Sequence, residues 1–219
     1  MEDVRQITRN RMVLLLIGGI PVTMILVATW LWYFVVRGDL DLVNMLGTAN
    51  RGSLVQPPRQ LDDQDLTDPG GLSLLYAELE PRWAMLVPGA AALCDEVCEQ
   101  SLYVTRQIHV ALGKEFNRVR RMYVSEARVG AVELAVAELS DRRPAPDSFS
   151  GYLEQEHRGI KALTLEVGAY GQLFPEHAAD PSTWYLVDPA GWIMMSYNSE
   201  IPYKDVISDL KFLLKNSSG

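Results

Sequence analysis

The chain has 219 residues, of which 48% are hydrophobic and 22% are charged, and its formal net charge is −8. This composition allows a packed core and excludes a wholly disordered chain, and the acidic balance excludes nucleic acid as a natural partner because phosphate backbones are repelled. The two cysteines lie four positions apart, which excludes a disulfide-stapled scaffold and indicates a local redox or metal-binding device.

Residues 12–36, MVLLLIGGIPVTMILVATWLWYFVV, carry no charged side chain. About 20 apolar helical residues cross the hydrocarbon core of a bilayer, so this segment predicts a transmembrane helix. The aromatic residues at its C-terminal end are typical of a membrane interface, whereas a cleaved signal peptide would have a shorter apolar core followed by small residues. More arginines precede the span than follow it closely: Arg5, Arg9 and Arg11 against Arg37 and Arg51.

This bias predicts a single-pass protein of the inner (cytoplasmic) membrane, with residues 1–11 as a cytoplasmic tail and the rest in the periplasm or an equivalent compartment. Residues 37–72 are rich in Gly, Pro, Asn and Asp. They predict a tether whose short apolar pieces can dock as edge strands. Residues 73–219 are expected to form one domain.

Within that domain, apolar runs at 74–76 and 82–87 suit strands, the second of them buried. Residues 95–112 predict a helix with a broad apolar face that ends at Gly113. The later segments predict, in order, a strand at 119–124, a helix at 131–139, a polar loop at 140–150, a strand at 160–167, a hairpin of 184–187 with 192–197, and an amphipathic helix at 203–215. This order predicts an α/β, thioredoxin-like domain, with a central mixed sheet flanked by helices.

Cys94 and Cys98 lie where the first buried strand turns into the next helix. On a helix, the i, i+4 spacing places both side chains on one face, with Cys94 at the N-terminus, where the helix dipole and unpaired amides stabilise a thiolate. Asp95 and Glu96 oppose that stabilisation. Three interpretations stay open: exchange of the pair with a client's thiols, binding of a soft ion such as copper(I), or a structural disulfide or inert pair.

Three segments resemble the Sco/SenC family: RWAMLVPGAAALCDEVCEQSLYVTRQIHVALG, WYLVDPAGWIMMSY and DVISDLKFLL. The resemblance extends over residues 50–215. It implies a membrane-anchored thioredoxin-like protein that helps assemble the dinuclear copper site of cytochrome c oxidase, as a copper chaperone or a thiol reductant. It also implies copper as the cofactor and a respiratory oxidase subunit, or another periplasmic thiol protein, as the partner. Cys94 would be the more exposed nucleophile or ligand, and Cys98 the resolving thiol or second ligand.

Two positions depart from the pattern of that family. Glu99 stands where a proline usually follows the second cysteine, and Asp180 stands where the spacing expects a histidine as the third copper ligand. His177, three residues earlier, is the candidate that replaces it. His109 is expected to be an ordinary helix residue, and His157, in a charged stretch, is expected to be solvated.

Pro181, directly before a predicted strand, is similar to the cis-proline that faces the active cysteines of thioredoxin-like oxidoreductases. A metal-ligating His177 would argue for copper, whereas Pro181 in cis would argue for a metal-independent periplasmic thiol–disulfide oxidoreductase. A non-catalytic adaptor is the third alternative. Met194 and Met195 offer thioethers, although alternation in a hairpin explains at least one of them. A small basic cluster is expected to be a solvated face: Arg118, Arg120 and Arg121.

Overall fold

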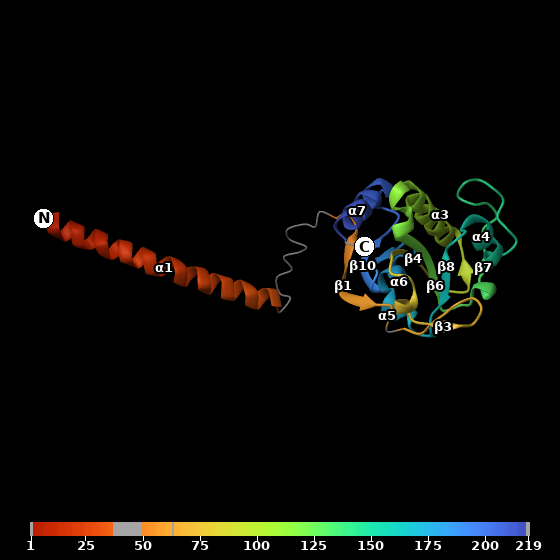
Figure 1. Ribbon diagram of the computed structural model, residues 1–219, viewed down its shortest axis with the longest axis horizontal. Helices are drawn as coiled ribbons and strands as arrows, with labels where there is room; N and C mark the ends of the chain where they lie inside the picture. The colour runs from red at the N-terminus through yellow and green to blue at the C-terminus, as the bar shows by residue number, and fades with distance from the viewer. Residues whose placement is uncertain (1, 37–49, 63, 218–219) are drawn as a thin grey trace. The chain divides into compact units, whose positions relative to one another are not determined.

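The computed structural model describes residues 2–36, 50–62 and 64–217, which belong to two separate units (Figure 1). The first unit contains the helix α1 (Glu2–Val36). Its stretch Leu15–Tyr33 has a mean hydropathy of 2.0 and is the one helix among the described residues that is long and apolar enough to cross a membrane. The side chains of this stretch are exposed, as those of a lipid-facing helix are. The predicted apolar N-terminal helix is confirmed.

The second unit begins at Asn50 and is built on a mixed sheet, with the described strands in the order β1-β10-β9-β4-β6-β8-β2-β3. Three parallel strands form its centre: β4 (Trp83–Gly89), β6 (Val119–Ser125) and β8 (Lys161–Thr164). Antiparallel strands extend it on the β4 side: β9 (Trp184–Val187), β10 (Trp192–Tyr197) and β1 (Ser53–Gln60). Two short antiparallel strands close the other edge: β2 (Leu66–Thr67) and β3 (Ser73–Leu74).

Both faces of this sheet are covered. Every residue of β4 is buried, and successive side chains enter different layers, so that Met85 and Val87 join one core cluster and Ala84 and Leu86 the other. Three helices pack into the first cluster: α3 (Glu96–Ala111), α4 (Phe149–Glu156) and α7 (Tyr203–Asn216). Residues around β1, the 3-10 turn η1 (Tyr76–Glu78) and α5 (Tyr170–Leu173) fill the second, and α6 (Pro175–Ala179) follows α5. The predicted thioredoxin-like architecture of a mixed sheet between helices is confirmed.

A small second sheet holds the first cysteine. The strand β5 (Leu93–Cys94) pairs in parallel with β7 (Glu133–Leu134), and the amide of Ala135 donates to the carbonyl of Cys94 at 2.9 Å. The predicted helix at 131–139 is therefore wrong. Its Ala, Glu and Leu residues favour a helix, but the more buried positions Val132, Leu134 and Val136 alternate with exposed ones, which is the period of a strand. The 3-10 turns η2 (Gly113–Arg118) and η3 (Val129–Ala131) complete the described elements.

Other boundaries also differ from the sequence prediction. The part of the tether expected at 37–49 lies outside the described residues, but residues 53–60 form the edge strand β1, so the expected boundary at 72 falls inside the sheet. Short apolar pieces of that segment do dock as edge strands. The helix α4 begins at the end of the predicted loop, because the Ser148 hydroxyl accepts the amide of Gly151 and caps it. The hairpin and the last helix agree with the prediction.

Candidate active site

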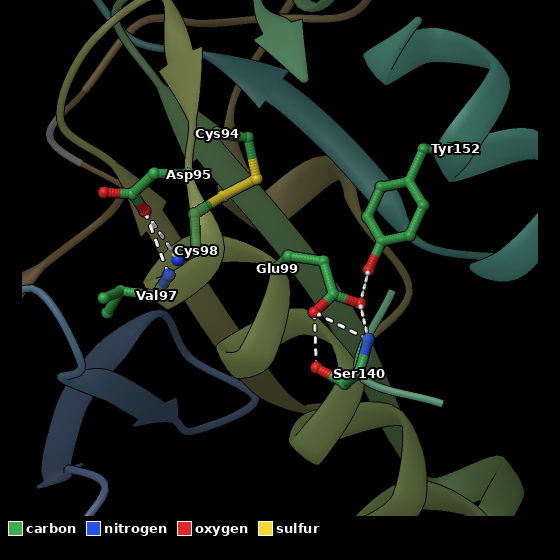
Figure 2. Close-up of a disulfide and its surroundings, with 7 residues drawn as sticks. All are labelled: Cys94, Asp95, Val97, Cys98, Glu99, Ser140 and Tyr152. Carbon is green, nitrogen blue, oxygen red and sulfur yellow. Dashed lines mark hydrogen bonds between the residues drawn. A yellow bond between two sulfur atoms is a disulfide. The ribbon is translucent and has the colours of Figure 1, made fainter. Parts of the chain in front are cut away.

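The two cysteines form a disulfide at the beginning of α3, with a Cα–Cα distance of 5.2 Å. Figure 2 shows Cys94 at the end of its strand and Cys98 in the first turn of the helix. The pair is therefore not two residues on one helix face, as the spacing predicted, because Cys94 precedes the residue that caps the helix. The geometry joins a fixed strand end to a helix start through one bond that thiol chemistry can open.

Asp95, which directly follows Cys94 in the sequence, is the N-cap of α3. Its carboxylate accepts the amides of Val97 at 3.1 Å and Cys98 at 3.0 Å (Figure 2). Such a cap stabilises a helix by about 1 kcal/mol. It also occupies amides that a thiolate at this helix end would otherwise use. The sequence predicts that free helix amides stabilise a thiolate. In the structure these amides donate to the Asp95 carboxylate instead, which stabilises the first turn of α3.

The two sulfurs differ in accessibility, in the opposite sense to the expectation. Cys94 is fully buried, whereas Cys98 is half-buried. The reason is the small sheet: β5 and β7 enclose Cys94 in the core, while the first turn of α3 reaches the surface. Cys98 is consequently the cysteine of the pair that lies closer to solvent.

Glu99, the next residue, is a buried carboxylate directly behind the disulfide. Its carboxylate accepts the amide of Ser140 at 3.2 Å and the hydroxyl of Tyr152 at 3.1 Å, and it also accepts the Ser140 hydroxyl (Figure 2). Burial, followed by the nearby Glu99 charge, raises the pKa of Tyr152 well above its ordinary range. Glu99, Ser140 and Tyr152 form a clamp, named the Glu99 clamp below, that ties the first turn of α3 to the 140 loop and to α4.

The sequence analysis noted Glu99 only as a departure from a proline. A signal for its role was present, because Glu99 lies three residues before Leu102 and so shares the apolar stripe of the helix. A charged residue on a buried stripe needs hydrogen-bond partners. The partners themselves come from residues 41 and 53 positions further along the chain and have no local signature.

His177, the candidate third ligand, lies in α6 and is buried. Its Nδ1 is hydrogen-bonded to the hydroxyl of Tyr170, and its amide donates to the hydroxyl of Tyr185 at 3.0 Å. Burial lowers the pKa of His177 to about 4, against the opposing charges of Asp180 and Asp95. The ring is neutral at neutral pH, which suits a metal ligand, but one of its nitrogens already has a protein partner.

The donor set does not fit a copper centre with three protein ligands. Among the residues that the structure describes, no three His, Cys, Asp or Glu side chains are grouped so that they could hold a metal ion. Both sulfurs are joined in the disulfide, and reduction would free two soft thiolates without a third ligand in place. The arrangement instead fits reversible formation of one S–S bond.

The expectations that His157 and Arg121 are solvated are wrong. His157 is fully buried rather than solvated, and its Nδ1 lies 2.8 Å from Nη1 of the buried Arg121, which is therefore not part of a solvated basic face. His109 is an ordinary buried helix residue, with Nε2 close to the carbonyls of Phe116 and Val119. Met195 is buried and Met194 is partly exposed, as alternation in the hairpin predicts: 1% against 38%.

The structure changes the interpretation of both Asp180 and Pro181. Pro181 is not in cis, since the cis peptide bond in the described part of the chain is Gln56–Pro57. One Asp180 oxygen accepts the amide of Ser182 at 3.0 Å and its hydroxyl at 2.8 Å, and the other accepts the side-chain amide of Asn198 at 3.1 Å. These bonds, that to the Ser182 hydroxyl first, lower the pKa of the Asp180 carboxyl. Asp180 therefore joins the approach to β9 with the end of β10.

The mixed sheet, its helical layers and a CxxxC disulfide at the start of the first helix of the domain define a thioredoxin-like protein with one redox-capable cysteine pair. The sequence model of a family described as "Transmembrane-like, thioredoxin-like, C-terminal domain" matches residues 83–217. The chain belongs to this family. A comparison with curated proteins finds no match.

Solved structures give the same fold. The copper-bound structure of yeast Sco1 aligns with a TM-score of 0.53 at 15% identity, over 78% of this chain and 97% of that one. A second yeast Sco1 structure gives 0.53 at 16%, over 75% and 99%. Copper-bound ScoI of Arabidopsis thaliana gives 0.50 at 12%, over 72% and 99%. At these identities the likeness establishes the thioredoxin-like fold of the Sco proteins.

Proposed function

We propose that this chain is a membrane-anchored thiol–disulfide exchange protein of the Sco type, which reduces a cysteine pair of a partner protein. The observation that carries the proposal is the Cys94–Cys98 disulfide, with one buried sulfur and one that reaches the surface. A bridge that closes so short a loop adds little stability by chain entropy, so a reversible role explains it better than a structural one.

The reaction starts from the reduced pair. The Cys98 thiolate attacks one sulfur of the client disulfide, whose S–S bond breaks, and the second client sulfur leaves as a thiolate and takes up a proton. Cys94, deprotonated in turn, then attacks the Cys98 sulfur, releases the client's first thiol and re-forms the Cys94–Cys98 bond. Two electrons have passed to the client. A dithiol reductant in the same compartment must reduce the pair before the next cycle.

The proposal extends to a client class and a compartment. The resemblance to the Sco proteins supports a respiratory oxidase subunit as the client, and the arginines before α1 support a cytoplasmic N-terminus with the thioredoxin-like domain in the periplasm. Cysteine pairs are oxidised and recycled in such a compartment. Protease protection of residues 50–219 in sealed spheroplast-derived vesicles of both orientations measures this topology directly.

The test of exchange uses the asymmetry of the two sulfurs. Cys94→Ser leaves the accessible sulfur alone and is expected to accumulate a mixed disulfide with an oxidised client or with glutathione, whereas Cys98→Ser leaves the buried sulfur and is expected to trap at least about tenfold less. Thiol alkylation followed by intact-mass measurement on the full chain gives both values. Equal trapping by the two variants, or trapping by neither, contradicts the proposal.

Copper delivery is tested in parallel. Copper(I) titration of the reduced full chain, beside Cys94→Ser/Cys98→Ser and His177→Ala, measures whether one ion is held. One tightly bound ion that is lost in both variants would restore the chaperone function and His177 as a ligand. Absence of binding above the double-serine control leaves thiol exchange alone.

A further inference from the structure

A cavity of about 600 Å³ lies between the first turns of α3 and the beginning of α7. Val97 and Ser101 of its wall lie next to Cys98 and one turn beyond it in the helix, respectively. Figure 2 shows the Val97 side chain pointing away from Glu99, on the side of the turn opposite the Glu99 clamp. The cavity is therefore a neighbour of the accessible sulfur and is separate from the clamp.

The interior of this cavity is largely apolar. It is lined by aliphatic and aromatic side chains that include Val97, Val104, Trp184, Ile201 and Val206. Val97 remains 38% exposed, although it is a β-branched apolar residue in the first turn of a helix. An apolar side chain of a partner would remove this surface from water, which is the main driving force for association.

One wall of the cavity is held in place by Asp180. Through Ser182 and Asn198, both of which line the cavity, the Asp180 carboxylate joins the approach to β9 with the loop that follows β10. The amide of Ser199 donates to the Ser182 hydroxyl at 3.2 Å and closes the connection. The wall is thus formed before any partner binds, which lowers the cost of ordering it.

The rim of the cavity is acidic. Glu96 lines it, and Asp95 and Glu200 lie next to lining residues; all three are exposed. Lys204 is the exposed cation among the described residues that line the cavity or adjoin its lining in the sequence. An acidic rim around an apolar interior complements a segment in which apolar and basic side chains alternate, and repels an acidic one.

We propose that this cavity is the client-recognition site of the protein: it takes an apolar side chain next to the client cysteine, while a basic residue of the same segment faces the acidic rim. The inference rests on the proposed thiol exchange, because that reaction is what brings a client segment to Cys98. It assigns to Asp180 the positioning of the recognition wall, and to Glu96 and Val97 the choice of client.

The experiment separates recognition from exchange by using peptides whose cysteine is replaced by serine. Fluorescein-labelled Arg-Leu-Ser-Leu-Arg and Glu-Leu-Ser-Leu-Glu are titrated against the full chain in nanodiscs of zwitterionic lipid, with empty nanodiscs as the blank, and binding is read by anisotropy. The basic peptide is expected to bind at least about tenfold more tightly, and its advantage is expected to fall at high salt. Equal affinities, preference for the acidic peptide, or no binding of either overturns the inference.

Matched variants locate the site. Glu96→Gln and Val97→Ser, both at exposed positions, are each expected to weaken binding of the basic peptide about threefold or more. Val110→Ser, an exposed valine at the far end of the same helix, and Glu166→Gln, an exposed carboxylate outside the lining, are expected to leave it unchanged. Equal losses in all four variants, or in none, would place the binding elsewhere and overturn the inference.

The proposed thiol exchange and the proposed recognition site can be refuted independently of each other. If the basic peptide binds selectively but neither single-cysteine variant traps glutathione, the recognition site stands and the exchange reaction does not. If trapping follows the accessible sulfur but the peptides bind without preference, the exchange reaction stands and the recognition site is refuted.

Discussion

Acid should destabilise this domain through His157, a histidine that is neutral in the fold and charged in the unfolded chain. His157 lies at the end of α4, fully buried, with its Nδ1 accepting from Arg121. Burial, then the positive charges of Arg121 and Arg106, lower its pKa to about 3, and Glu156 opposes them only in part. The unfolded side chain has a pKa of about 6.5.

The sign and size follow from proton linkage. Because the folded pKa is depressed, the unfolded state binds the extra proton first, so stability is complete above about pH 6.5 and is lost progressively as the pH falls toward 3. Between about pH 7.5 and pH 5.0 the loss attributable to His157 is about 2 kcal/mol, or 1.5 pKa units at 1.36 kcal/mol each. His177, whose pKa is lowered to about 4, and His109, whose pKa is also lowered, act in the same direction.

Comparison of the wild type with His157→Asn isolates the contribution of His157, because the Asn oxygen can accept from Arg121 and does not titrate. Urea unfolding of the full chain in detergent, followed by near-ultraviolet circular dichroism at the two pH values, gives the free energies of unfolding. The wild type should lose about 2 kcal/mol more than His157→Asn between the two pH values. Glu154→Gln, an exposed change in the same helix, should behave as the wild type. An identical pH dependence for His157→Asn and the wild type would falsify this reasoning.

Three further predictions concern the Glu99 clamp, the end of β4 and the disulfide. Glu99→Ala leaves the Tyr152 hydroxyl without its acceptor and is expected to lower the free energy of unfolding in urea by about 3 kcal/mol. Glu96→Ala, an exposed change in the same turn, should change it by no more than about 0.5 kcal/mol. Similar losses in the two variants would refute the Glu99 clamp. Gly89→Ala places a Cβ 2.8 Å from the Cβ of Ser125 and against the hydroxyl of Tyr123. Thermal unfolding should therefore show a loss of stability of about 1–3 kcal/mol. Gly130→Ala, whose Cβ meets open space, should show no such loss. Reduction of the disulfide should cost about 2 kcal/mol or less in urea unfolding, because the loop is so short; a much larger loss would identify a structural staple.

Much of the fold follows from local pattern. The buried run of β4, the hairpin around Gly191 and the amphipathic α7 each have a pattern that matches one secondary structure. Each pattern gives bounds within a residue or two of those observed. In the segment 131–139 the residue preferences favour a helix, whereas the two-residue alternation of burial is that of the observed strand β7 and its flanks. The edge strand β1 contains Pro57 and Pro58, so its local sequence favours a loop, and its pairing with β10 depends on a strand far along the chain.

The features of the candidate site also divide into those that follow from local sequence and those that depend on distant contacts. The cysteine spacing and its place after a buried strand predict where the disulfide lies in the fold, since both are local features of the sequence. The relative burial of the sulfurs could not be read locally, because Cys94 is enclosed by a strand that begins at Glu133. The partners of Glu99 and the burial of His157 likewise depend on contacts between distant elements.

Asp180 shows most clearly why a family pattern and a structure can assign one position differently. By spacing, it stands where a copper-ligating histidine is expected, and a carboxylate there suggests a substitute ligand. Its oxygens instead accept hydrogen bonds from Ser182 and Asn198, which join the approach to β9 with the end of β10. These three hydrogen bonds occupy three of the about four lone-pair sites that a carboxylate offers. The position therefore joins the approach to β9 with the end of β10, and its two partners, Ser182 and Asn198, lie in the wall of the cavity proposed to take the client segment.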